Sequence, residues 1–550
     1  MNHFEQLKSE FFLFLQNHLQ IPTHVINSSL FDLNIDEEKQ SFGDINANIA
    51  MICAKELKRN PRELAQEIIN NFKHEDINRI EVAGPGFLNF FMTHGWYQKL
   101  AQEIAQKKET FFADKPTHPK KINIEFVSAN PTGPMHVGHG RNGILGDVFA
   151  NVSTFLHHDV TKEFYINDAG AQITKLGNSF KIRCLQNLGD QNIELPEDAY
   201  HGEYLVDLAK TCVAQFGQNL TQEPDSFFQD YAKEHMLINL QQTLESYGIL
   251  FNIWFSEKSL HDHGKVHDAL ERLIRTGHTY EQEGALWFRS TTFGDDKDRV
   301  LRKANAELTY VAADIAYLID KIDRGFDELV MVLGHDHHSY KTRLNAIMQA
   351  LGYDPKKLNV ILYQLVHVMK DGEQFKMSKR TGNMVSLEEV VQEVGKNVAR
   401  FFFLNRKADA ELQFDIDLAL KQSNENPVYY IQYAYVRTLS IQKKAADENI
   451  ITAKDCNYDL SLSDLEKLIL KKICSLKSLI FNIGQNHQIH LLAYFTLELA
   501  TLFHRYYNAQ RVIDASNPEV TQQRLHIIGL VQQTLKTCLF LMGVTPMEKM

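Results

Sequence analysis

Two short motifs in this sequence carry side chains suited to phosphate chemistry. The first, His136-Val137-Gly138-His139, follows a run of strand-forming residues and precedes a helical pattern. At such a junction the backbone amides and the helix dipole favour an anion, and two imidazoles add hydrogen-bond donors for phosphate oxygens. Gly138 removes the Cβ that would keep a flat base away from the backbone. We predict a nucleotide site at this motif, and the alternative is a surface turn that bears two histidines.

The second motif is a lysine-rich run, KMSKR, at residues 376–380. Gly372 and Gly382 flank it, as glycines flank a mobile loop. Lys376 and Lys379 would bring positive charge to a place where a pyrophosphate leaving group builds up negative charge. Taken alone, a basic loop is usually a solvated surface. The presence of both motifs in one chain favours nucleotide chemistry over two unrelated surface features.

Four polar residues are candidates for a second binding pocket. Tyr310 and Asp314 stand four apart at the start of a helical pattern, so a ring and a carboxylate share one face. This pair suits a planar guanidinium, which accepts bidentate hydrogen bonding and stacking. Glu125 and Asn130, on the segment that leads into the first motif, could add an anionic and an amide contact. Each residue alone is equally an ordinary helix-face or strand-end side chain.

A sheet is needed to bring these residues together. We predict an α/β fold with a parallel, doubly wound sheet, because apolar strand patterns alternate with helical ones around both motifs. Ligands bind at the carboxyl ends of the strands in such a sheet, where the first motif lies. The predicted strands are residues 121–127, 160–166, 329–333 and 360–366, and the predicted first helix is residues 140–156.

The pattern divides the chain into three parts. Residues 1–115 have the pattern of a small α/β module, and a polar, lysine-rich stretch at 106–121 is predicted to separate it from the rest. The central part is residues 120–400, interrupted by a polar and helical insertion at about 167–285. Residues 425–550 have helical periodicity throughout and predict an all-α bundle.

Local signals predict where several elements begin and end. The turn at Gly84-Pro85-Gly86 predicts a hairpin or a bend at a strand entry. Ser463 and Glu466 have the spacing of a capping box at the start of a helix, and Gly484 is predicted to end that helix.

The composition excludes several classes of protein. Of 550 residues, 58 are basic and 69 acidic, and the formal charge of −11 argues against non-specific coating of nucleic acid but not against a local basic surface. Charged residues make up 23%, which together with only 28 Gly and 13 Pro excludes disordered and collagen-like chains. The six cysteines are scattered, so we expect reduced core thiols. The sequence has no apolar run of about 18 residues and no signal-like start, so we expect a cytoplasmic protein without a membrane partner.

The pair HVGH and KMSKR, in this order on a βαβ-type sheet, resembles the signature pair of the class I aminoacyl-tRNA synthetases. Longer segments narrow the resemblance to the arginyl branch, among them TYVAADIAYLIDKIDRGFD, GHDHHSYKTR and NPVYYIQYAYVR. The resemblance implies a Rossmann-type catalytic domain, an N-terminal additional domain that contacts the D-loop corner of tRNA, and a C-terminal anticodon-binding domain. It also implies activation of L-arginine with ATP, loss of pyrophosphate and transfer to the 3′ end of tRNA, typically only after tRNA has bound.

The resemblance assigns roles to individual residues. Those implied to bind ATP are His136, Gly138, His139, Gly334, Asp336, Lys376, Met377, Ser378 and Lys379. Those implied to act on the phosphates in catalysis are His136, His139, Lys376 and Lys379. Those implied to bind arginine are Glu125, Asn130, Tyr310 and Asp314. Those implied to contact tRNA are Tyr429, Tyr433 and Arg437. We also expect at least two of the tyrosines at 429, 430, 433 and 435 to belong to the bundle core.

The remaining expectations concern metals, assembly and alternatives. ATP is expected with Mg²⁺, no structural metal is expected, and zinc at His335, His337 and His338 is a minor alternative because no cysteine or carboxylate pair completes a ligand set. His367 is a weaker candidate for the active site. The resemblance favours a monomer. A catalytically silent tRNA-binding paralogue would have broken motifs, and another class I synthetase or a nucleotidyl transferase would differ in the pocket around Asp314.

Overall fold

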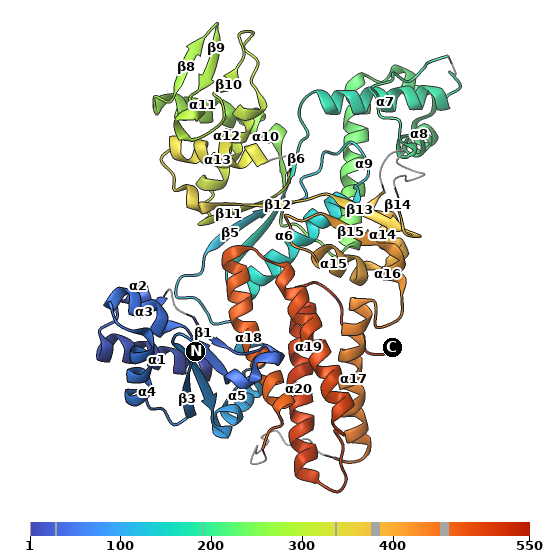
Figure 1. The fold of residues 1–550 in the computed structure, drawn as a ribbon. Coiled ribbons are helices and arrows are strands. Elements are labelled where there is room, and N and C mark those ends of the chain that lie inside the picture. Colours follow the sequence, from blue (N-terminus) through green and yellow to red (C-terminus); the bar gives the residue numbers. More distant parts are fainter. Residues whose placement is uncertain (1, 28–29, 191, 336–337, 376–384, 451–460) are drawn as a thin grey trace.

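The computed structural model shows three bodies packed side by side (Figure 1). The residues described are 2–27, 30–190, 192–335, 338–375, 385–450 and 461–550, without the side chain of His338. An N-terminal module and a C-terminal helical bundle lie together below a central sheet domain. Two groups of elements extend from the top of the sheet domain, helices on one side and a small sheet on the other.

The N-terminal module is a four-stranded antiparallel sheet covered by helices. Its strands follow the order β1-β2-β4-β3. Their bounds are β1 Phe31–Leu33, β2 Ile45–Ala47, β3 Ile77–Ala83 and β4 Phe87–Met92. The helices are α1 His3–Leu19, α2 Thr23–Asn27, α3 Ile49–Leu57, α4 Pro61–Asn71 and α5 His94–Lys107. The turn at residues 84–86 joins β3 and β4 into the predicted hairpin.

The central domain has the predicted parallel sheet, in the order β12-β11-β5-β6-β7. Its strands are β5 Lys121–Glu125, β6 Asp159–Ile166, β7 Ile253–Ser256, β11 Glu328–Gly334 and β12 Leu358–Tyr363. The chain runs from β5 through helix α6 (Val137–Phe155) to β6 on one side, whereas β11 pairs with β5 on the other side. The strand order therefore reverses at β5, which is where ligands bind in doubly wound sheets. The α/β, Rossmann-type fold class is confirmed.

The stretch predicted as one insertion, residues 167–285, contains a helical group, a strand of the main sheet and the beginning of a second projection. Its first part is the helical group α7 Ala171–Asn187, α8 Glu203–Phe216 and α9 Asp225–Ser246, which projects from the domain (Figure 1). Strand β7 follows and pairs in parallel with β6, so it belongs to the main sheet. The polar composition of this stretch hid a short edge strand, since an edge strand is not buried on every side.

After β7 the chain builds a second projection around a small antiparallel sheet. Its strands, in the order β10-β9-β8, are β8 Thr279–Gln282, β9 Ala285–Phe288 and β10 Arg299–Arg302. The helices around it are α10 Glu257–Asp262, α11 Lys265–Arg275, α12 Tyr310–Asp323 and α13 His338–Ala350.

The segment predicted as one strand, residues 360–366, is two strands in two sheets. Strand β12 ends at Tyr363, and β13 (Val366–Lys370) begins a separate sheet with β14 (Glu373–Gln374) and β15 (Leu412–Asp415). The backbone between them is redirected by a distant segment, because Gln364 N donates to Ala408 O and Leu412 N donates to Leu365 O. Helices α14 Leu387–Val394, α15 Lys396–Leu404 and α16 Ile416–Leu420 accompany this second sheet.

Helix α6 lies unusually close to its neighbours because glycines face them. A Cβ on Gly146 would stand 2.2 Å from the ring of Phe126, and a Cβ on Gly140 would stand 2.5 Å from Leu387. Such distances are far below van der Waals contact, so only glycine fits. The helix therefore lies against the end of β5 and carries the HVGH motif at its N-terminus.

The C-terminal part is the predicted bundle. Its helices are α17 Pro427–Asp447, α18 Asp464–Asn486, α19 His490–Ala509 and α20 Pro518–Leu541. The capping box of α18 is confirmed, with Ser463 and Glu466 each accepting from the other's backbone amide. The predicted stop at Gly484 is wrong, because the helix continues and His487 caps it. A Cβ on Gly484 would stand 2.6 Å from Leu156, so this glycine serves close packing against the end of α6.

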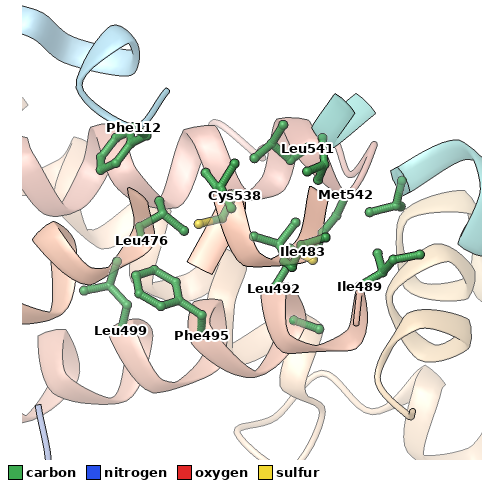
Figure 2. Packing of buried hydrophobic residues seen from close by; sticks show 14 of the residues in the cluster. Phe112, Leu476, Ile483, Ile489, Leu492, Phe495, Leu499, Cys538, Leu541 and Met542 are labelled. Atoms are coloured by element: carbon green, nitrogen blue, oxygen red, sulfur yellow. The ribbon is translucent and has the colours of Figure 1, made fainter. Parts of the chain in front are cut away.

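The three bodies are joined by buried contacts. The stretch 106–121 packs rather than separates, because Phe111 and Phe112 are 1% and 0% exposed. Figure 2 shows Phe112 in the same apolar cluster as Leu476 and Cys538 of the bundle. Lys471 of the bundle donates to Asp44 of the N-terminal module at 3.0 Å. The described cysteines, Cys53, Cys184, Cys212, Cys474 and Cys538, are buried free thiols.

The last residues of the chain bind back to the central domain. Arg400, which is 1% exposed, donates through Nε to Met542 O at 3.0 Å and also pairs with Asp147 of α6. Asn397 exchanges two hydrogen bonds with the backbone of Thr545. The segment after α20 thus ties the bundle to helix α15, whose Arg400 in turn pairs with α6.

We predict that Gly146→Ala lowers the free energy of unfolding by about 1–3 kcal/mol, because its Cβ would overlap the buried ring of Phe126. Thermal unfolding of the purified variant would measure this loss. The matched control is Gly529→Ala in α20, where the nearest atom to a new Cβ is Gln442 Nε2 at 3.5 Å. There we expect a gain of about 0.5–1 kcal/mol from helix propensity. Equal effects at the two positions would contradict the packing argument.

Candidate active site

A cavity of about 1230 Å³ opens at the carboxyl ends of β5 and β11, where the strand order reverses. It brings together predicted residues from four separate segments of the chain. These are Glu125, Asn130, His136, Gly138, His139, Tyr310, Asp314 and Gly334. The predicted residues Asp336, Lys376, Met377, Ser378 and Lys379 lie outside the described part of the chain. Phe375 and Val385, the described neighbours of residues 376–384, line the same cavity.

The two motif histidines form a reciprocal cap on α6. His136 Nδ1 accepts from Gly138 N at 3.0 Å, and His139 Nδ1 accepts from His136 N at 3.3 Å. The rings stack with their centroids 3.7 Å apart. A Cβ on Gly138 would stand 2.8 Å from the ring of His136, so this glycine seats the ring as well as leaving space for a base.

These contacts determine the protonation state that each ring offers to a ligand. Burial lowers the pKa of His136, and burial together with the neighbouring His136 ring lowers the pKa of His139 to about 3. Both imidazoles are therefore neutral near pH 7. Because each Nδ1 accepts a backbone hydrogen bond, the single proton of a neutral ring resides on Nε2. The motif thus presents two Nε2–H donors, which suit phosphate oxygens.

The backbone just after residues 376–384 is fixed to the HVGH turn. Val137 N donates to Val385 O at 3.3 Å, and Leu387 N donates to Met135 O at 2.9 Å. His136 and Ser386 form a β-bridge between them. The chain that resumes at Val385 is therefore held directly against the first motif, although about 250 residues of sequence separate the two.

Asp314 stands in the cavity wall on the first turns of α12. Its Oδ1 accepts from the hydroxyl of Tyr340 at 2.9 Å, and Arg343 Nη1 lies 3.9 Å from Oδ2. Burial raises the pKa of Asp314 to about 7, against the opposing effects of Tyr340 and Arg343. Tyr310, one turn earlier, is 66% exposed at the cavity. The predicted pairing of ring and carboxylate on one helix face is present.

Glu125 has a more enclosed setting than the sequence indicated. It is 5% exposed and forms an ion pair with Lys321, itself 2% exposed, while the hydroxyl of Ser128 donates to its other oxygen at 3.2 Å. Glu125 thus has a buried counter-ion, Lys321. Asp314 is less well compensated, because the nearest cationic atom among the described residues, Arg343 Nη1, lies 3.9 Å away. Asn130 is exposed at the cavity.

Other predicted residues have different surroundings. His367 does not face the cavity: Val366 and Val368 line it, and the alternation of the strand directs His367 toward Gln374 and Glu411. His335 lines the cavity and is exposed, whereas His337 and the side chain of His338 lie outside the described residues. Within the described ranges, no three His, Cys, Asp or Glu side chains gather as metal ligands.

The predicted tRNA-contacting residues form a stacked group on α17. Tyr429 stacks on Tyr433 at 6.5 Å, Tyr433 stacks on His504 at 5.3 Å, and the guanidinium of Arg437 lies between the rings of Tyr433 and Tyr507. Of the four tyrosines, Tyr435 is buried in the core and Tyr430 packs against it; the other two are half-buried.

A smaller cavity of about 260 Å³ lies in the N-terminal module. Polar side chains line it beside the half-exposed ring of Phe87, which follows the turn at 84–86. Its polar residues are Asp32, Asn34, Asp36, Lys39, Asn46 and Asn48. Amides and carboxylates beside an aromatic face can read the edge of an unpaired base.

Sequence reasoning missed several residues that shape the main cavity. Tyr340, Arg343 and Asn142 line it, and Lys321 pairs with Glu125 behind it. The signal for Lys321 was a lone cation in the apolar run of α12. Arg141, which is fully buried, donates to the carbonyls of Gln364, Lys407 and Ala410, a role that no local pattern indicates.

Comparison with known proteins gives consistent matches along the chain. Family profiles described as arginyl tRNA synthetase N terminal domain, tRNA synthetases class I (R) catalytic domain and DALR anticodon binding domain match residues 15–92, 99–417 and 431–550. Arginine–tRNA ligases of Bacillus velezensis and Bacillus subtilis are each 41% identical and cover 93% of both chains. A putative arginyl-tRNA synthetase structure from Campylobacter jejuni is 35% identical, with a TM-score of 0.77, over 84% of this chain and all of that one. The Thermus thermophilus arginyl-tRNA synthetase, 20% identical over all of both chains, shares the fold with a TM-score of 0.77.

We predict that His139 remains a neutral Nε2–H tautomer at pH 5.5, where an ordinary imidazole of pKa about 6.5 is mostly protonated. The lowered pKa means that the ring gains a proton only well below this pH. Nitrogen-15 NMR of histidine-labelled protein would report the tautomer, with His139→Gln identifying the signal by its loss. An imidazolium signal for His139 at pH 5.5 would refute the assignment.

Proposed function

The chain belongs to the arginyl-tRNA synthetase family, within class I, and on that premise we propose how its cavity performs the reaction of an arginine–tRNA ligase. The enzyme joins L-arginine to tRNA at the expense of ATP. The observation that carries the mechanism is that the two HVGH imidazoles and the Tyr310–Asp314 pair line one cavity. One cavity of about 1230 Å³ offers room for both a nucleotide and an amino acid.

In the first step the carboxylate of arginine attacks the α-phosphorus of ATP. The new bond is the mixed anhydride of arginyl-adenylate, and the bond to the β-phosphate breaks to release pyrophosphate. This displacement needs positioning and charge stabilisation rather than a protein nucleophile. The Nε2–H groups of His136 and His139 donate to phosphate oxygens and carry no formal charge. ATP enters as its Mg²⁺ complex, as a substrate.

The cations for the departing pyrophosphate come from Lys376 and Lys379. Support for this role comes from the described residues on either side of them, since Phe375 and Val385 line the cavity. Further support is that Val385 and Leu387, which follow the lysines, form hydrogen bonds with the backbone of the HVGH turn. Gly138, Gly334, Asp336, Met377 and Ser378 complete the proposed ATP subsite.

The arginine side chain is held by Asp314 and Tyr310. The Oδ2 edge of Asp314 accepts the guanidinium, while Tyr340 holds Oδ1, and the ring of Tyr310 covers the flat face of the cation. Asn130 and Glu125 hold the α-amino end near the phosphates. Selection rests on the geometry of a planar, doubly donating cation, which a lysine ammonium lacks.

In the second step the 3′-terminal ribose hydroxyl of tRNA attacks the carbonyl of the adenylate, and AMP leaves. We propose that Tyr429, Tyr433 and Arg437 stack against anticodon bases, supported by their half-exposed, stacked arrangement on α17. The N-terminal cavity beside Phe87 is proposed to take bases from the outer corner of the tRNA.

We also propose that the enzyme acts as a monomer in the cytoplasm, where charged tRNA is used. Its three bodies already cover one another's apolar faces through clusters such as that in Figure 2. In the described part of the chain, no helix combines the length and apolarity that a membrane span requires.

The test of the reaction is arginine-dependent exchange of labelled pyrophosphate into ATP, with and without total tRNA. We expect exchange only when arginine and tRNA are both present. Exchange with arginine in the absence of tRNA would support the proposed activity but show that activation does not require tRNA. No exchange under either condition would refute the proposed activity.

We predict that the KM for arginine falls as pH rises from 6 to 8, because Asp314, with a pKa of about 7, must lose its proton to pair with the guanidinium. Asp314→Asn should raise that KM about 100-fold and abolish its pH dependence in this range, leaving the KM for ATP within about twofold. Steady-state exchange assays measure all three quantities. A normal KM for arginine in the Asp314→Asn variant would show that the guanidinium is held elsewhere.

A further inference from the structure

The two central strands of the main sheet part from each other at the cavity. The last paired residues of β5 and β11 are Glu125 and Met331, although β11 continues to Gly334. Directly after Glu125 the chain turns away through Val127 and Ser128, whose φ angles are +65° and +41°. A β-branched residue rarely adopts this left-handed conformation. The turn that opens the cavity is therefore strained.

One side chain of α6 fills the gap where the strands separate. Asn142 Oδ1 accepts from Val127 N at 2.6 Å, and Asn142 Nδ2 donates to Val332 O at 2.9 Å. If β5 and β11 remained paired beyond Glu125 and Met331, Val127 N would donate directly to Val332 O. The amide of Asn142, 4% exposed, takes the place of that missing backbone hydrogen bond and satisfies both groups.

The strained turn carries the residues proposed to hold the α-amino end of arginine. The hydroxyl of Ser128 donates to Glu125 and accepts from Tyr165 N at 3.1 Å, so the turn also fixes the carboxylate behind it. Asn130 follows two residues later and lines the cavity. If Val127 N bonded directly to Val332 O, β5 and β11 would stay paired for longer, and the segment from 126 to 130 would move into the cavity.

We propose that Asn142 is a positioning residue for arginine binding: its side-chain amide holds β5 and β11 apart at the strained Val127–Ser128 turn and so keeps Glu125 and Asn130 in place. This inference rests on the proposed function, since it assigns these two residues to the arginine subsite. It differs from a direct contact, because the effect of Asn142 on the substrate passes through the backbone at Val127.

The test is a rescue experiment. Asn142→Ala should lower kcat/KM for arginine by about tenfold in the pyrophosphate exchange assay with tRNA, because the strained Val127–Ser128 turn loses the amide that holds it and Glu125 and Asn130 shift with it. The KM for ATP should change less than about twofold. Adding Val127→Gly should restore most of the arginine kcat/KM, since glycine adopts a φ of +65° without strain and the turn then needs no clamp. Val127→Gly alone should bind arginine nearly as the unaltered enzyme does.

A matched control separates rescue of the turn from general stabilisation. Lys58 has a φ of +51° at the end of α3, so Lys58→Gly relieves a similar strain far from the cavity. Combined with Asn142→Ala it should not restore arginine use. Thermal unfolding of all variants is measured in parallel.

Each outcome has a clear consequence. If Asn142→Ala fails to fold, folding and arginine use by the double variant with Val127→Gly support the proposal. The proposal is overturned if adding Val127→Gly to Asn142→Ala does not raise kcat/KM for arginine. It is also overturned if adding Lys58→Gly to Asn142→Ala raises that kcat/KM equally. A defect confined to the KM for ATP also overturns it, since Asn142 would then serve the nucleotide. Loss of exchange in the unaltered enzyme would instead refute the proposed function.

Discussion

The structure depends on the close approach of helix α6 to the central sheet. Its glycines bring the helix to distances that no Cβ allows, with 2.2 Å separating a hypothetical Cβ of Gly146 from Phe126. Since the helix is held this close, its first turn lies at the end of β5, and the HVGH rings face the cavity. The same closeness lets the buried polar side chains of α6, Arg141, Asn142 and Asp147, reach backbone and side chains on three sides. The site thus depends on helix α6, which packs closely against the sheet although several of its buried side chains are polar.

Three carboxylates around the site differ in how completely nearby cations balance their charge. Glu163 lies deepest, and although burial opposes its ionisation, hydrogen bonds from Arg324 and Tyr317 hold its pKa below the ordinary value. Glu125 lies nearer the cavity and has Lys321 as its counter-ion. Asp314 is at the cavity wall, and its raised pKa reflects a carboxylate whose compensation is incomplete. Under the proposed function, a cationic substrate supplies that compensation. The proposed specificity for a guanidinium then rests on Asp314, because Glu163 and Glu125 already have cationic partners.

The sequence predicted that residues 125–139, 310–314 and 334 meet in one cavity, since the carboxyl ends of parallel strands lie at one edge of the sheet. The fold class and the bundle followed from periodicity. What could not be predicted depended on contacts between distant segments. The strand at 360–366 is broken by hydrogen bonds to residues 408–412, and Gly484 continues a helix because Leu156 lies against it. Asn142 looked like any polar helix residue, because its role depends on which strands it faces. Residues 106–121 carried many lysines, and their composition concealed the two phenylalanines that anchor them in the core.

The hydrogen bonds between the end of the chain and the interior of the catalytic domain have a consequence for biosynthesis. Arg400 is buried against Asp147 of α6 and donates to the carbonyl of Met542, while Asn397 pairs with the backbone of Thr545. Residues 542–545 are translated after every element they join. Domains that emerge early from the ribosome generally fold as they appear. When the central domain emerges, the guanidinium of Arg400 still lacks its acceptor at Met542 O. The domain therefore reaches its full stability only after residues 542–545 have been translated. A polypeptide that stops before Met542 would therefore be less stable than one that includes residues 542–545.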